Sequence, residues 1–152
     1  MARFIIVYQS RMGNTRAMAD AIREGAESRK LETEVVDAFD VNIKDLRAAA
    51  ALGFGGPTMN YHPAKPLVKV LDELSRHDVR GKIAVAFGSY GGDGLGPIVI
   101  AERLREMGFR VLDPVERVIY KPTDNEPECL RHPGKDVAMA VKKIPHIKSL
   151  NI

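Results

Sequence analysis

Runs of apolar residues separated by polar segments dominate the hydrophobic pattern of this chain. Three of the runs, at residues 4–8, 48–54 and 83–87, lack a strict alternation of apolar and polar positions. Such runs are typical of strands in a parallel sheet that is covered on both faces. Two further runs, at residues 33–36 and 110–120, are more polar or more alternating. We therefore predict three central strands and two peripheral strands in one sheet.

Between the predicted strands, apolar residues recur with the spacing of one helix face. The spacing i, i+3, i+4, i+7 is complete or nearly complete in four segments, and a weaker helix is predicted at 42–47. Gly108 is the expected C-cap of the third of the four helices, and Pro145 is expected to end the last. The four segments are residues 18–25, 67–74, 100–107 and 137–144.

Strands and helices alternate along the chain, with short connections and no sequence repeat. This alternation predicts an α/β fold in which a doubly wound, five-stranded parallel sheet carries helices on both faces. Pro114 interrupts the last predicted strand, as is tolerated near a sheet edge. At 152 residues the chain is expected to form a single domain spanning residues 1–152.

The composition is that of an ordinary globular domain, with 45% hydrophobic and 28% charged residues. No apolar run approaches the roughly 20 residues that a membrane-spanning helix needs, so we expect a cytoplasmic protein that does not bind membranes. The net charge is +3, but the basic residues are scattered among acidic ones. Nucleic-acid binding is therefore not expected. The single Cys129 excludes an internal disulfide, and we assign it no function.

A loop at residues 10–15 leads from the first predicted strand into the first predicted helix. The amides at the start of a helix and the positive end of its dipole both favour an anion. The hydroxyls of Ser10 and Thr15 can add donors to the amides of residues 12–15. The loop therefore predicts a phosphate-binding site, although the same residues also suit a plain turn into a capped helix.

Two more loops with ligand-binding character follow the other central strands. Residues 57–61 combine hydrogen-bonding groups with soft or flat apolar surfaces, a mixture that suits a planar heteroaromatic ring. Residues 88–94 hold four glycines, so the backbone can approach a ligand closely, and Tyr90 can supply ring contact. Ligands of doubly wound sheets bind beyond the carboxyl ends of the strands, where all three loops are expected. A phosphate in one loop and a ring between the other two describe a mononucleotide, and FMN is the natural candidate.

Four motifs carry a resemblance to a known family. The segments YQSRMGNT, GPTMN, FGSYG and YKPTD, at residues 8–15, 56–60, 87–91 and 120–124, resemble the flavodoxin-like domain of flavodiiron proteins, also called A-type flavoproteins. The likeness covers nearly the whole chain. It implies a flavodoxin-like fold with strand order 2-1-3-4-5, which is the order of flavodoxin itself and is taken from that fold. It also implies noncovalently bound FMN as a one- and two-electron carrier.

The resemblance also assigns roles to individual residues. The first loop would hold the phosphate, residues 57–60 would line one side of the flavin, and residues 89–92 the other. The full set of expected FMN-binding residues is Ser10, Arg11, Met12, Gly13, Asn14, Thr15, Pro57, Thr58, Met59, Asn60, Tyr61, Ser89, Tyr90, Gly91, Gly92 and Gly94. No residue is assigned a catalytic or metal-binding role.

The chain departs from the family pattern in two respects. The family usually carries a Trp where this chain has Gly92, so Tyr61 or Tyr90 would have to replace that ring. Flavodiiron proteins also place a diiron domain before this one, whereas this chain begins at its first strand. The four histidines are dispersed and predict no metal site, so no reduction of dioxygen or nitric oxide is assigned.

These observations favour an FMN-binding electron carrier over a substrate-specific oxidoreductase. Two alternatives stay open: an NAD(P)H-dependent flavin or quinone reductase on the same fold, and an interaction domain without a cofactor. The positive net charge suggests an acidic redox partner of the rubredoxin or ferredoxin type, and a separate diiron protein is a further candidate. Formation of a homodimer is left open.

Overall fold

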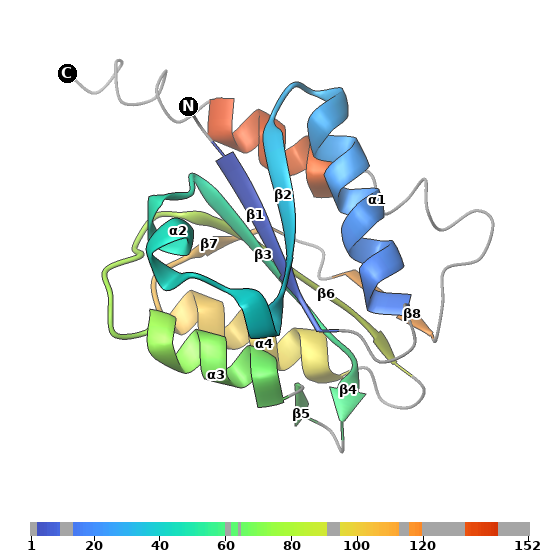
Figure 1. The fold of residues 1–152 in the computed structure, drawn as a ribbon, viewed down its shortest axis with the longest axis vertical. Coiled ribbons are helices and arrows are strands. Elements are labelled where there is room, and N and C mark those ends of the chain that lie inside the picture. The colour runs from blue at the N-terminus through green and yellow to red at the C-terminus, as the bar shows by residue number, and fades with distance from the viewer. Residues whose placement is uncertain are drawn as a thin grey trace.

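A parallel sheet forms the centre of the fold (Figure 1). The computed structural model of the chain describes residues 3–9, 14–59, 62–63, 65–90, 95–112, 116–119 and 133–142. The strands lie in the order β2-β1-β3-β6-β7, and β8 also pairs with β6. All of these pairings are parallel. The strand bounds are β1 (Arg3–Tyr8), β2 (Glu32–Asp37), β3 (Ala51–Gly55), β6 (Ile83–Tyr90), β7 (Arg110–Val111) and β8 (Glu116–Ile119).

The two short strands β7 and β8 together fill the fifth position of the sheet. Strand β7 pairs with Ile83 and Ala84 at the start of β6, and β8 pairs with residues 87–90 at its end. The predicted interruption at Pro114 falls between them, outside the described residues. The five positions therefore follow the order 2-1-3-4-5, which confirms the predicted topology and the two predicted edges.

Helices cover both faces of the sheet (Figure 1). Helix α1 (Asn14–Ser28) and the helical segment at residues 133–142 lie on one face. The other face is covered by α2 (Ile43–Ala48), α3 (Lys65–Leu74) and α4 (Leu95–Glu106). A short 3-10 helix, η1 (Ala38–Asp40), follows β2. The helices predicted from apolar spacing are confirmed, except that the predicted end of the last one, at residues 143–145, lies outside the described residues.

Each central strand contributes side chains to two separate cores, because successive side chains point to opposite faces. Phe4, Ile6 and Tyr8 of β1 pack in the core under α1, whereas Ile5 and Val7 pack in the core under α3 and α4. The strand is therefore apolar at every position from Phe4 to Tyr8, which explains why its sequence shows no alternation.

A small antiparallel hairpin extends beyond the carboxyl end of β3. Strands β4 (Thr58–Met59) and β5 (His62–Pro63) pair with Met59 opposite His62, so only two residues separate these paired positions in the sequence. The hairpin contacts α4. The sequence pattern did not predict it, since a two-residue strand is too short to show periodicity.

The predicted start of the third strand at residue 48 is wrong. Helix α2 includes Ala48, and β3 begins only at Ala51. The side chain of Asn42 caps this helix by accepting a hydrogen bond from the Lys44 N–H at 2.9 Å. Ala is the strongest helix former, so residue 48 continues a capped helix instead of joining the strand.

Helices α1 and α4 end in the same backbone motif with different residues at its critical position. After α1, the Leu31 N–H donates to the Ala26 carbonyl and the Lys30 N–H donates to the Glu27 carbonyl. After α4, Phe109 and Gly108 repeat this pattern. Both are Schellman motifs, which need a residue with positive φ. Gly108 has a φ of 98°, as its predicted capping role requires, whereas Lys30 adopts a φ of 64° with a full side chain.

This difference predicts opposite effects of two substitutions. Lys30→Gly should raise the free energy of unfolding by about 0.5–1 kcal/mol, because the left-handed conformation strains a residue with a Cβ atom. Gly108→Ala should lower it by about 1–2 kcal/mol, since the new Cβ would be strained and would also lie 2.6 Å from Arg80 Cγ. Urea unfolding followed by circular dichroism measures both changes. A destabilising Lys30→Gly variant would contradict the strain at this position.

Candidate functional site

The carboxyl ends of β1, β3 and β6 lie side by side, because these strands are neighbours in the sheet. The chain leaves each of these ends toward one of the three loops with ligand-binding character. The Gln9 N–H donates to the Gly55 carbonyl at 2.9 Å, which extends the pairing of β1 and β3 past the end of β1. The three loops therefore start from one edge of the sheet, as the doubly wound pattern predicted.

The structure describes part of the predicted site. Asn14 and Thr15 begin α1, Pro57 precedes β4, Thr58 and Met59 form β4, and Ser89 and Tyr90 end β6. The FMN-binding role of all the predicted residues stays a prediction, and nine of them lie outside the described residues: Ser10, Arg11, Met12, Gly13, Asn60, Tyr61, Gly91, Gly92 and Gly94.

The boundary of the third loop differs from the prediction. Residues 88–90 belong to β6, where Gly88 pairs with Arg117 and Ser89 pairs with Val118 of β8. Gly88 therefore also has a packing role that the sequence did not reveal. A Cβ atom at this position would lie 2.3 Å from the Gly56 carbonyl oxygen and 2.7 Å from Pro97 Cγ. This close approach brings the starts of the second and third loops together.

The first turn of α1 suits an anion. It contains no acidic residue, so the partial positive charge of the helix N-terminus is not opposed there. Thr15, in this turn, is only 2% exposed. Among the described residues it is the one polar residue found buried. These features fit the phosphate-binding role predicted for the loop that precedes α1.

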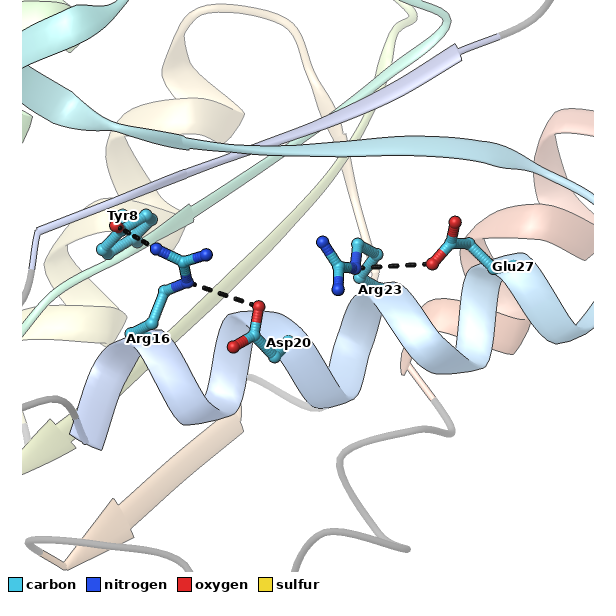
Figure 2. A network of polar contacts seen from close by, with 5 residues as sticks. All are labelled: Tyr8, Arg16, Asp20, Arg23 and Glu27. Carbon is cyan, nitrogen blue, oxygen red and sulfur yellow. Dashed lines mark hydrogen bonds and ion pairs between the residues drawn. The ribbon is translucent and has the colours of Figure 1, made fainter.

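Arg16 links the first turn of α1 to the last residue of β1 (Figure 2). Its Nη1 donates to the Tyr8 hydroxyl at 2.7 Å, and its guanidinium carbon lies 5.1 Å from the centre of the Tyr8 ring. Its Nε lies 3.4 Å from Asp20 Oδ1, and Figure 2 shows a second ion pair, between Arg23 and Glu27, farther along α1. The hydrogen bond to Tyr8, together with Asp20, raises the pKa of Arg16 above its ordinary value. Arg16 thus stays a cation and ties the helix start to the sheet.

Gln9 was not among the predicted site residues. Its side-chain oxygen Oε1 is buried and accepts no hydrogen bond from the residues that the structure describes. A buried acceptor without a donor costs about 1–3 kcal/mol, so native proteins rarely keep one without a reason. Gln9 directly precedes the predicted phosphate loop. Its position next to that loop was the signal in the sequence that could have drawn attention to it.

Two searches of the described residues found nothing. No group of three His, Cys, Asp or Glu side chains there could hold a metal ion. Within the same ranges, no helix is both long enough and apolar enough to cross a membrane. Of the four histidines, His132 and His146 lie outside these ranges.

The strand order and the helix N-terminus at the switch point define a doubly wound α/β domain of the flavodoxin-like, mononucleotide-binding class. The family model described as flavodoxin matches residues 6–134. The chain therefore belongs to the flavodoxin family.

Individual relatives agree with this assignment. The solved structure of a flavodoxin from the domain Archaea is 44% identical with a TM-score of 0.89, and the match covers 92% of this chain and 99% of that one. The putative diflavin flavoprotein A 6 of Nostoc sp. is 28% identical over 97% of this chain, which spans 26% of that relative. Rubredoxin oxygen:oxidoreductase from Desulfovibrio gigas is 26% identical with a TM-score of 0.86, over 92% of this chain and 36% of that one. The chain thus spans about a quarter to a third of the longer relatives.

Membership of this family identifies the chain as an FMN-binding electron-transfer flavoprotein, which confirms the predicted cofactor and function class. The reductase alternative has no better support from the comparisons. The described residues also fit FMN, because they offer an anion-binding helix start and an unpartnered buried acceptor at the same edge of the sheet.

Proposed function

We propose that the three loops at the carboxyl edge hold FMN and that the protein carries electrons between other redox proteins. The observation that carries this proposal is the adjacency of β1, β3 and β6, which leads all three loops to one edge. Residues 10–15 bind the phosphate through backbone amides and hydroxyls, whereas residues 57–61 and residues 89–92 with Gly94 enclose the flavin ring. Bound FMN supplies one- and two-electron redox chemistry, and the protein tunes it through contacts and nearby charge.

Gln9 extends this proposal to a residue that sequence reasoning missed. The ribityl chain of FMN carries hydroxyl groups, and a hydroxyl is the kind of donor that the buried Gln9 Oε1 lacks. Gln9 is therefore a residue that positions the cofactor between the phosphate loop and the ring.

The redox partner that we propose is a small acidic protein of the rubredoxin or ferredoxin type, or a separate diiron protein, met in the cytoplasm. The net charge of +3 supports an acidic partner, because opposite charge accelerates encounter between proteins. The printed name of the Desulfovibrio gigas relative, rubredoxin oxygen:oxidoreductase, supports rubredoxin as a first candidate.

The cofactor assignment predicts that the purified protein is yellow and holds about one FMN per chain. Mass spectrometry of the chromophore released by acid should identify FMN. Addition of NAD(P)H should leave the flavin oxidised over minutes, since a carrier has no binding site for nicotinamide. A colourless protein that fails to take up added FMN would overturn the proposal, and rapid bleaching by NAD(P)H would favour the reductase alternative.

The proposed role of Gln9 predicts effects of opposite sign in the two forms of the protein. Gln9→Leu should stabilise the apoprotein by about 1 kcal/mol, because it removes a buried acceptor that has no donor. The same variant should weaken FMN binding about 5- to 30-fold, the value of one hydrogen bond of about 1–2 kcal/mol. Urea unfolding and quenching of flavin fluorescence on binding measure the two quantities.

Thr33→Val is the matched control for Gln9→Leu, since it also replaces a polar side chain by an apolar one of similar shape. The Thr33 hydroxyl donates to the Leu31 carbonyl at 2.9 Å, away from the proposed site. This variant should lose about 1 kcal/mol of stability and keep its FMN affinity. If Gln9→Leu behaves like this control, Gln9 has only a structural role.

Asn60 is predicted to control the separation of the two one-electron potentials of the flavin. Two-residue connections between antiparallel strands generally need positive φ, which Asn tolerates and Ala does not. A backbone peptide that turns over to donate to flavin N5 needs the same freedom. Asn60→Ala should therefore narrow the separation by about 60 mV, a tenfold change in a one-electron equilibrium. Asn42→Ala, which removes the cap of α2, should lower stability without this effect, and redox titration distinguishes them.

A further inference from the structure

A groove runs along the surface between α3 and α4. Its volume is about 620 Å³. Apolar side chains line most of it, among them Pro63 of the β4–β5 hairpin, Val68 of α3 and Val99 of α4. Val99 is 37% exposed. The groove therefore presents apolar surface that the fold itself does not cover.

The charges at the groove are unevenly paired. Arg103 of α4 and Asp72 of α3 form an ion pair at 2.5 Å, which joins the two helices. Lys65 and Lys69 lie one helical turn apart on α3, are exposed, and form no ion pair with any residue in the described ranges. In the described part of the chain, no carboxylate lies within ion-pair distance of either ammonium group, and the nearest acidic residues along α3, Asp72 and Glu73, follow Lys69 by one helical turn.

A second hollow of about 290 Å³ adjoins the groove and shares Lys69 with it. It lies against η1 and α3, where the Phe39 ring is 74% exposed. Three large apolar side chains are recorded as exposed in the described part of the chain, and Phe39 and Val99 border these two hollows. Exposed apolar groups that border surface hollows are typical of an interaction surface. We call Phe39, Lys65, Lys69 and Val99, with the two hollows between them, the α3 surface.

The α3 surface begins next to the predicted ring-binding loops. Helix α3 follows the β4–β5 hairpin in the sequence, and α4 follows residues 91–94, so the helices start at the carboxyl edge of the sheet. A protein seated on their first turns would lie at the flavin end of the molecule, where electron transfer requires it.

We propose that the α3 surface is the docking site for the acidic redox partner. An apolar group of the partner fills the groove beside Val99, and carboxylates that flank it meet Lys65 and Lys69. Charge complementarity selects this occupant, because three cationic side chains, Lys65, Lys69 and Arg103, line the groove against the single carboxylate of Asp72. The proposal rests on the proposed function of the chain as a carrier with an acidic partner.

The test follows electron transfer from the reduced FMN-loaded protein to an acidic recombinant rubredoxin by stopped-flow absorbance, over a range of salt concentrations. One electron leaves the reduced protein and converts ferric to ferrous rubredoxin. The double variant Lys65→Glu/Lys69→Glu should lower the second-order rate constant at low salt by about tenfold. Val99→Asp should lower it by about fivefold at high salt as well, since it places a charge in the apolar groove.

Arg29→Glu/Lys30→Glu is the matched control, because it makes the same charge change at the far end of α1 on the other face of the sheet. It should change the rate constant by less than about threefold, through net charge alone. FMN content and thermal stability of every variant confirm that the fold is kept.

The outcomes separate the docking surface from the proposed function. A slower rate for the α3 variants alone supports the α3 surface. If transfer is fast and salt-dependent but the α3 variants match the control, the partner docks elsewhere. The proposal of an acidic partner is then kept, and the proposal of the α3 surface is overturned. If the unchanged protein transfers no electrons to rubredoxin, or transfers them with no dependence on salt, the acidic partner is overturned and the α3 surface with it.

Discussion

Parallel pairing of β1, β3 and β6 is the constraint on which the site depends. These strands are apolar at nearly every position because helices cover both faces, so each strand is held by two cores as well as by its hydrogen bonds. A shift by one residue would move every side chain into the opposite core, where its size and shape would not match its neighbours, so close packing of the two cores fixes the register. This register also fixes where the three loops begin relative to one another. The bond from Gln9 to Gly55 and the close approach of Gly88 to Gly56 then hold the loop starts together.

The elements that the sequence predicts well are those with a strong period. The buried stripe of α3 is compatible only with a helix, and the unbroken apolar run of β1 only with a buried strand. The structure confirms both predictions. The strand order came from a known fold, because periodicity does not say which strands are neighbours. The sequence could not predict the β4–β5 hairpin, because its strands are too short to show a period. It could not predict the left-handed conformation of Lys30 either, because that conformation depends on backbone hydrogen bonds.

In the candidate site, too, the sequence predicts local features and misses those that depend on distant residues. Loop chemistry at residues 10–15 is local, so residue type and position were enough to predict a phosphate site. The unpartnered Gln9 and the contact of Arg16 with Tyr8 depend on neighbours distant in the sequence. Gly88 shows a third case, in which a glycine expected to admit a ligand also admits the carbonyl of Gly56, just beyond the end of β3. Sequence reasoning recognises such a residue but not every group that approaches it.

Net charge alone does not describe this molecule fully, because part of the positive charge is paired locally. Arg16 and Arg23 face carboxylates four residues on, and Arg103 faces Asp72 across two helices. The anion binding that is predicted at the start of α1 therefore relies on backbone amides and the helix dipole more than on unpaired side chains in the first turn.

Free cationic charge remains on α3, where Lys65 and Lys69 have no such partners in the described part of the chain. In the proposed arrangement, cofactor binding and partner recognition thus depend on different kinds of group. The backbone and small residues at the strand ends set the first, and side chains on a helix face set the second. Substitutions on the helix face leave the strand ends in place, so in this arrangement the partner can change without a change in flavin binding.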